Sequence, residues 1–136
     1  MHQDVTAGVI HHNGKTGRDP SAADLNRHAI EVKKYAGIGY HFVIRRDGSI
    51  EEGRPLDAWG AHCRGHNDYT VGICVNENLE EEEITPGQFA SLVGLARWLQ
   101  EEFEGLGAWY PHCELEPTLC PGANFPWERF TRDLGR

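Results

Sequence analysis

The sequence is short of long apolar runs, of basic charge and of a secretory leader. No run of 18 apolar residues occurs in it, so no part of the chain is expected to insert into a membrane. The formal net charge is −8, and phosphate backbones are bound mainly by clustered Lys and Arg, so nucleic acid is not expected as a partner. The opening stretch "MHQDVTAGVIHHNG" has only a short apolar run, and we therefore expect no export through a signal peptide.

The length and composition are those of one domain with one core. The chain has 136 residues, of which 39% are hydrophobic and 25% charged, and no internal repeat, low-complexity tract or linker divides it. In a chain expected to stay in reducing surroundings, the cysteines at positions 63, 74, 113 and 120 are free thiols by default. A cluster of Cys and His then indicates metal binding or catalysis, and a disulfide between Cys113 and Cys120 is the structural alternative.

Several segments have the composition of β-strands. Residues 4–12 are expected to form a strand that stops at the turn pair Asn13-Gly14, and residues 69–78 form another, with apolar side chains at alternate positions. Between them, two β-prone arms flank Asp47-Gly48, a dipeptide that favours a hairpin with a type I′ turn.

Three segments have the periodicity of helices. The first is expected over residues 19–37, with Asp19 as its cap, and the last begins near Pro126. The helix after Thr85 has a capping box formed with Gln88. Strands and helices alternate, which predicts an α/β fold: a single domain with a central mixed β-sheet flanked by about three helices.

The reactive residues gather at a strand end and in one late loop. His11 and His12 end the first strand, and because strand side chains alternate between faces, only one of them can serve a given site. In the loop "PHCELEPTLCPG", His112 and Cys120 are candidate zinc ligands, with His11 as the third. A buried thiol beside a surface imidazole remains the plainer interpretation of this loop.

The prolines of the same segment predict a constrained loop instead of a helix. Its two acidic residues, Glu114 and Glu116, are candidates for accepting a proton or supporting a ligand by a hydrogen bond, although solvated loop acids are the simpler interpretation. In the loop "WGAHCRGHN", His62 is expected to line a cleft and to contact substrate.

Read in order, the segments "VIHHNG", "GYHFVIRRDGSIEEGR", "GAHCRGHNDYTVGICVNEN", "TPGQF" and "PHCELEPTLCPG" resemble those of the zinc-dependent N-acetylmuramoyl-L-alanine amidases of type 2. That family includes phage lysozyme-amidases and peptidoglycan-recognition proteins, and the resemblance covers roughly residues 5 to 130. It implies a Zn²⁺ ion held by His11, His112 and Cys120, with Tyr40 and Thr118 at the reaction centre. Because members that only bind peptidoglycan have typically lost the thiol, Cys120 favours an enzyme.

The resemblance also implies a substrate and a setting. The expected reaction is hydrolysis of the amide bond between the lactyl group of N-acetylmuramic acid and L-alanine in bacterial peptidoglycan. We expect a phage or prophage endolysin, a monomer whose residues 1–136 form one catalytic domain without a separate wall-binding domain. It would wait in the host cytoplasm until lysis. Two alternatives stay open: a non-catalytic peptidoglycan-binding module of the same fold, and a metal-dependent amidase for another N-acyl substrate.

Overall fold

A five-stranded mixed sheet runs through the centre of the computed structural model, which describes residues 4–135. The strand order is β3-β2-β4-β1-β5, in which β3 is antiparallel to β2 and the other neighbours are parallel. The strands are β1 (Ala7–His12), β2 (Phe42–Ile44), β3 (Ile50–Glu52), β4 (Thr70–Val75) and β5 (Ala108–Pro111). The four parallel strands therefore end at one edge of the sheet, where ligand sites of α/β proteins gather.

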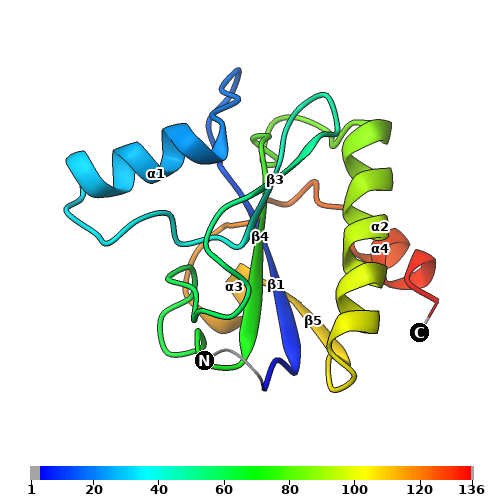
Figure 1. Ribbon diagram of the computed structural model, residues 1–136. Coiled ribbons are helices and arrows are strands. Elements are labelled where there is room, and N and C mark those ends of the chain that lie inside the picture. Colours follow the sequence, from blue (N-terminus) through cyan, green and yellow to red (C-terminus); the bar gives the residue numbers. More distant parts are fainter. Residues whose placement is uncertain (1–3, 136) are drawn as a thin grey trace.

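Helices cover both faces of this sheet (Figure 1). They are α1 (Ala22–Glu31), α2 (Pro86–Glu102), α3 (His112–Leu115) and α4 (Trp127–Asp133). The long helix α2 and the short helix α4 lie on one side, and α1 lies on the other. The predicted α/β architecture is confirmed, while the single turn α3 lies where a loop was expected. No helix in residues 4–135 has the length and apolar character needed to cross a membrane.

The core lies mainly between the sheet and α2. Ile10, Ile73 and Val75 are fully buried against Leu92 and Leu99 of α2. The opposite face carries a smaller cluster around Val43, which meets residues of α1. Because β1 and β4 are covered on both faces, their sequences are apolar almost throughout, as parallel strands require.

Of the predicted starts of α1 and α2, one is confirmed and the other is wrong. At α2, the backbone N–H of Gln88 donates to Thr85 Oγ1 at 3.1 Å and the reciprocal bond is present, so the predicted capping box is confirmed. At α1, the prediction of Asp19 as cap was wrong, because Ser21 forms a capping box with Asp24. The helix also ends at Glu31, well before residue 37.

The hairpin at Asp47-Gly48 is present, but its turn is not type I′. That turn needs a positive φ at both central residues, and among residues 4–135 Lys34 is the one non-glycine residue with a positive φ. Gly48 alone has a φ of 88°, and its N–H donates to the carbonyl of Arg45. The Asp47 carboxylate accepts the N–H and the hydroxyl of Ser49, a local contact that stabilises the turn.

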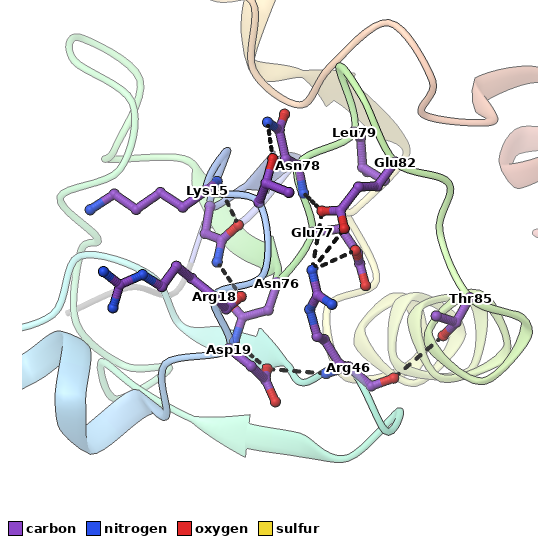
Figure 2. Close-up of polar contacts among 12 residues, drawn as sticks. Lys15, Arg18, Asp19, Arg46, Asn76, Glu77, Asn78, Leu79, Glu82 and Thr85 are labelled. Carbon is purple, nitrogen blue, oxygen red and sulfur yellow. Dashed lines mark hydrogen bonds and ion pairs between the residues drawn. The ribbon is translucent and has the colours of Figure 1, made fainter.

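Asp19 instead belongs to a polar network beside the edge where the parallel strands end (Figure 2). Its carboxylate accepts from the backbone N–H of Arg46 at 3.1 Å and from Asn76 Nδ2 at 2.9 Å. The Arg46 guanidinium in turn pairs with Glu77 and Glu82 at 3.2 and 3.1 Å. The network therefore ties the loop after β1 to the hairpin and to the loop after β4.

Candidate functional site

Sheet register brings His11 and His112 together. β1 and β5 are parallel, with Ile10 opposite Pro111. The next residues are His11 in β1 and His112, which begins α3 directly after β5. Their ring centroids lie 4.5 Å apart. β5 was not predicted, because two β-prone residues before a proline are too short a run to identify a strand. The aromatic pair in "AWYP" was the available signal.

Cys120 reaches the same point from a closed loop. The backbone N–H of Cys113 donates to the Cys120 carbonyl at 2.8 Å, which brings the two ends of the loop together. The backbone N–H of His12 donates to Cys120 Sγ at 3.3 Å, and His11 Nδ1 lies 3.6 Å from that sulfur. One ligand atom from each of His11, His112 and Cys120 lies within 4.8 Å of the others.

This group fits zinc in its chemistry and in its spacing. Tetrahedral Zn²⁺ with bonds of about 2.0–2.1 Å to nitrogen and about 2.3 Å to sulfur holds its ligand atoms roughly 3.5 Å apart. His112 Nδ1 is buried and has no hydrogen-bond partner among the described residues, which is costly unless a ligand satisfies it. Burial raises the pKa of the Cys120 thiol to about 12, although the hydrogen bond from the N–H of His12 acts to lower it. A metal ion that binds the sulfur must therefore displace the thiol proton.

A hydrogen-bond chain fixes the orientation of His11. The Thr70 hydroxyl donates to the carbonyl of His66 at 2.6 Å, so its oxygen accepts from His62 Nε2 at 3.2 Å. His62 Nδ1 is then an acceptor, and His11 Nε2 donates to it at 2.9 Å. The network thereby assigns the lone pair of His11 to Nδ1, the atom nearest Cys120.

Glycine makes room for this chain. Thr70, Gly72 and His11 lie on the same face of the sheet, because Gly72 is opposite Val9 and Cys74 is opposite His11. A Cβ at Gly72 would lie 2.5 Å from ring atoms of His62. Burial, and then the neighbouring histidines, lower the pKa of His11 well below its usual value, so the ring is neutral, as a metal ligand must be.

Tyr40 lies beside the same ring. Its ring centroid is 5.1 Å from that of His11. The neighbouring Cys74 and burial raise the pKa of the Tyr40 phenol well above its usual value, so the hydroxyl is a proton donor at neutral pH. Tyr40 and His62 line a cleft of about 280 Å³ that also includes Lys15 and Lys33. A phenol, an imidazole and two lysine side chains thus line the same cleft.

Thr118 lies in the loop that carries Cys120. It is exposed, and its hydroxyl oxygen accepts the backbone N–H of Cys120 at 3.2 Å. The contact helps to shape the approach to the thiol.

Comparison with known proteins places the chain in a family. The family model for N-acetylmuramoyl-L-alanine amidase matches residues 1–123. The chain belongs to this family. The amidase LysC from Clostridium intestinale superposes with a TM-score of 0.90 at 34% identity, over 97% of this chain and 86% of LysC.

The curated relatives of this chain include proteins of phages and proteins of insects. An endolysin of Klebsiella phage KP32 is 35% identical over 99 residues, which are 68% of this chain and 65% of the endolysin. Peptidoglycan-recognition protein SC2 of Drosophila melanogaster is 28% identical over 128 residues, which are 88% of this chain and 70% of that protein. The match thus spans slightly less than two thirds of the phage endolysin.

The other histidines near the site have structural contacts, and the cysteines are unbridged. His12 points to the face opposite His11, where its Nδ1 accepts the backbone N–H of Leu79 at 3.0 Å. His41 is fully buried, and its ring forms hydrogen bonds with the backbone of Ala58 and Gly72. All four cysteines lie in the described residues and are free, so the disulfide alternative is not formed. Substrate contact by His62 stays a prediction.

Proposed function

We propose that this chain is a zinc-dependent amidase that cleaves the bond between the lactyl group of N-acetylmuramic acid and L-alanine in peptidoglycan. The observation that carries the proposal is the convergence of His11, His112 and Cys120 beside Tyr40, with His112 Nδ1 buried and unpartnered among residues 4–135. A structural zinc site needs four protein ligands. This group supplies three, which leaves a position for chemistry.

The proposed roles follow from the atoms that face the site. His11 and His112 would hold the ion through Nδ1 and Cys120 through its thiolate. Bound Zn²⁺ supplies Lewis acidity toward a carbonyl and lowers the pKa of water to about 7. The protonated hydroxyl of Tyr40 would donate to the oxygen of the scissile carbonyl as negative charge develops on it. Thr118, at the rim, would give a second and weaker hydrogen bond.

The biological setting is part of the proposal. The relatives named as endolysins support a role in degrading the bacterial wall, with peptidoglycan as the partner and the catalytic domain reaching the wall at lysis. A single catalytic domain over residues 1–136 without a wall-binding domain, a monomeric state and storage in the host cytoplasm stay predictions. The binding-module alternative is disfavoured by the thiol of Cys120, which a recognition protein does not need.

A digest of purified peptidoglycan tests the proposal. Zinc-loaded protein should release peptides with a new N-terminal L-alanine and leave lactyl groups with a free carboxylate, as resolved by mass spectrometry. A His112→Ala variant is the matched control and should release neither. Zinc-loaded wild-type protein that binds peptidoglycan but leaves every lactyl-alanine bond intact would instead establish the binding module. Cleavage of other N-acyl amides alone would point to a different substrate.

A further inference from the structure

The two acids of the late loop have different surroundings. Glu116 Oε1 lies 2.7 Å from His112 Nε2, at i,i+4 across the single turn of α3. Glu114 is exposed on the same turn, and the structure gives it no hydrogen bond or ion pair within the described residues. The structure therefore separates two carboxylates that the sequence left equivalent.

The contact fixes which nitrogen of His112 carries the proton. An ionised carboxylate only accepts hydrogen bonds, so Nε2 must be the donor and the lone pair must lie on Nδ1. That is the buried atom without a partner among the described residues, and it belongs to the group with His11 and Cys120. The carboxylate thus prepares His112 to bind through the atom that faces the other two ligands.

Glu116 is itself held in place from behind. The backbone N–H of Arg64 donates to the same oxygen, Oε1, at 3.0 Å. Cys63 is 1% exposed, and its sulfur lies within 4.8 Å of the Glu116 carboxylate and of a His112 ring nitrogen. Cys63 therefore packs behind the carboxylate.

We propose that Glu116 is a positioning residue for the proposed metal ligand His112, orienting its ring and keeping its proton on Nε2, with Arg64 and Cys63 holding the carboxylate in place. The inference rests on the proposed function, because it takes the metal to bind at Nδ1.

A second metal ion held by Cys63, His112 and Glu116 is the rival explanation of this cluster. It is disfavoured because an imidazole that binds one ion through Nδ1 keeps the proton on Nε2 at neutral pH. The two explanations predict different stoichiometries. Our proposal predicts one tightly bound zinc per chain, and the rival predicts two.

The affinity for Zn²⁺ is the decisive measurement, made by competition with a chromophoric chelator in the absence of substrate. Loss of such a supporting hydrogen bond typically weakens metal affinity by roughly 10- to 100-fold, and we expect this for Glu116→Ala. Glu114→Ala, on the same turn, is the matched control and should bind as wild type does. Glu116→Gln keeps the shape and the acceptor oxygen but not the charge, so its affinity should fall between the two.

The tautomer of His112 is the second readout, measured in the metal-free protein by long-range ¹H–¹⁵N correlation. Wild type and Glu114→Ala should carry the proton on Nε2, and Glu116→Ala should show a mixture of tautomers. Unchanged zinc affinity and an unchanged tautomer in Glu116→Ala would overturn the inference, as would two tightly bound zinc ions per wild-type chain. If Glu116→Ala does not fold, Glu116→Gln decides, since wild-type zinc affinity there would show that the charge is not needed. Wild-type protein that binds no zinc would contradict the proposed function itself.

Discussion

His11 and His112, the two proposed ligand histidines, present the same atom to the site but are supported in opposite ways. His11 lies inside the sheet, 1% exposed, and its far nitrogen donates to His62, which donates to Thr70. His112 lies at the rim, with a side chain 16% exposed, and its far nitrogen donates to the carboxylate of Glu116. His11 is supported by a series of neutral hydrogen bonds, and His112 is supported by a charged carboxylate.

Burial explains the difference. An ionised carboxylate is expensive to bury without strong compensation, so the interior histidine is oriented by neutral groups. Glu116 keeps 28% of its side chain exposed, and water can share its charge. Both rings therefore carry their lone pair on Nδ1, as the proposed zinc binding requires, and the burial of each ring decides whether its other nitrogen donates to a neutral or a charged acceptor.

Removing either ring should have the largest effect. His11→Ala and His112→Ala should each hold well under one zinc per chain, as measured by elemental analysis after dialysis, and should have no detectable amidase activity, because each leaves two of the three proposed ligands. His12→Ala is the control for the first, since its side chain lies on the other face of the sheet and bonds Leu79. Zinc loss in His12→Ala with zinc retained in His11→Ala would reverse the assignment.

Changing Tyr40 should leave both supports intact and impair only turnover. Tyr40→Phe removes one hydroxyl and keeps the ring that lies against His11, so zinc content should be normal. Loss of one donor to a developing oxyanion typically lowers the rate by roughly 10²–10³, while substrate affinity changes little. Steady-state kinetics on peptidoglycan fragments give both quantities. A wild-type turnover rate at normal zinc content would limit Tyr40 to packing.

Breaking the neutral chain should have a smaller effect on zinc than breaking the charged contact. Thr70→Val removes the hydroxyl that accepts from His62 Nε2 and donates to the carbonyl of His66, and loss of one partner of a buried hydrogen bond costs about 1–3 kcal/mol of stability. Zinc affinity should fall less than in Glu116→Ala, because hydrogen bonds to charged groups are roughly twice as strong as neutral ones. Thermal unfolding and chelator competition measure the two effects, and Thr70→Ser is the conservative control. A greater loss of zinc affinity in Thr70→Val than in Glu116→Ala would contradict this ranking.

Asp19 offers a test away from both histidines, with the smallest expected effect. Burial opposes it, but hydrogen bonds from Arg45 and Asn76 lower the pKa of Asp19 below its usual value. A depressed carboxyl pKa stabilises the fold at pH values above the unfolded pKa of about 3.9, and this contribution is lost as the pH falls through the folded value. Denaturant unfolding of wild type and Asp19→Asn should therefore differ at pH 6 and converge in acid. A gap independent of pH would show that the charge of Asp19 is not responsible.

The surroundings of His11 could be predicted from the sequence better than those of His112. Strand alternation separates His11 from His12, and the structure places the two side chains on opposite faces as expected. The partner His62 lies 51 residues away from His11, and no local pattern connects two such positions. The predicted cleft-lining position of His62 is consistent with the structure, but its bond to His11 depends on the packing of a loop over Gly72.

On the His112 side, Glu116 could be named as a candidate support but could not be distinguished from Glu114, and the reason is local. Glu116 follows His112 by four residues, the spacing at which helical side chains meet. The prolines of that segment predicted a constrained loop instead of a helix, so the helical spacing was not applied and Glu114 and Glu116 stayed indistinguishable. Residues His112–Leu115 form a helical turn that ends before Pro117, so the proline sets the end of the helix without preventing it.

X-ray absorption at the zinc edge of the loaded protein tests the central claim most directly. The account predicts one sulfur at about 2.3 Å and two imidazole nitrogens at about 2.0–2.1 Å, with a fourth, non-protein light atom completing the shell. Substitution of Cys120 by Ser should remove the sulfur contribution, whereas Cys63→Ser should leave it unchanged. A shell of four protein ligands, or a sulfur contribution that disappears with Cys63 and persists without Cys120, would contradict the account.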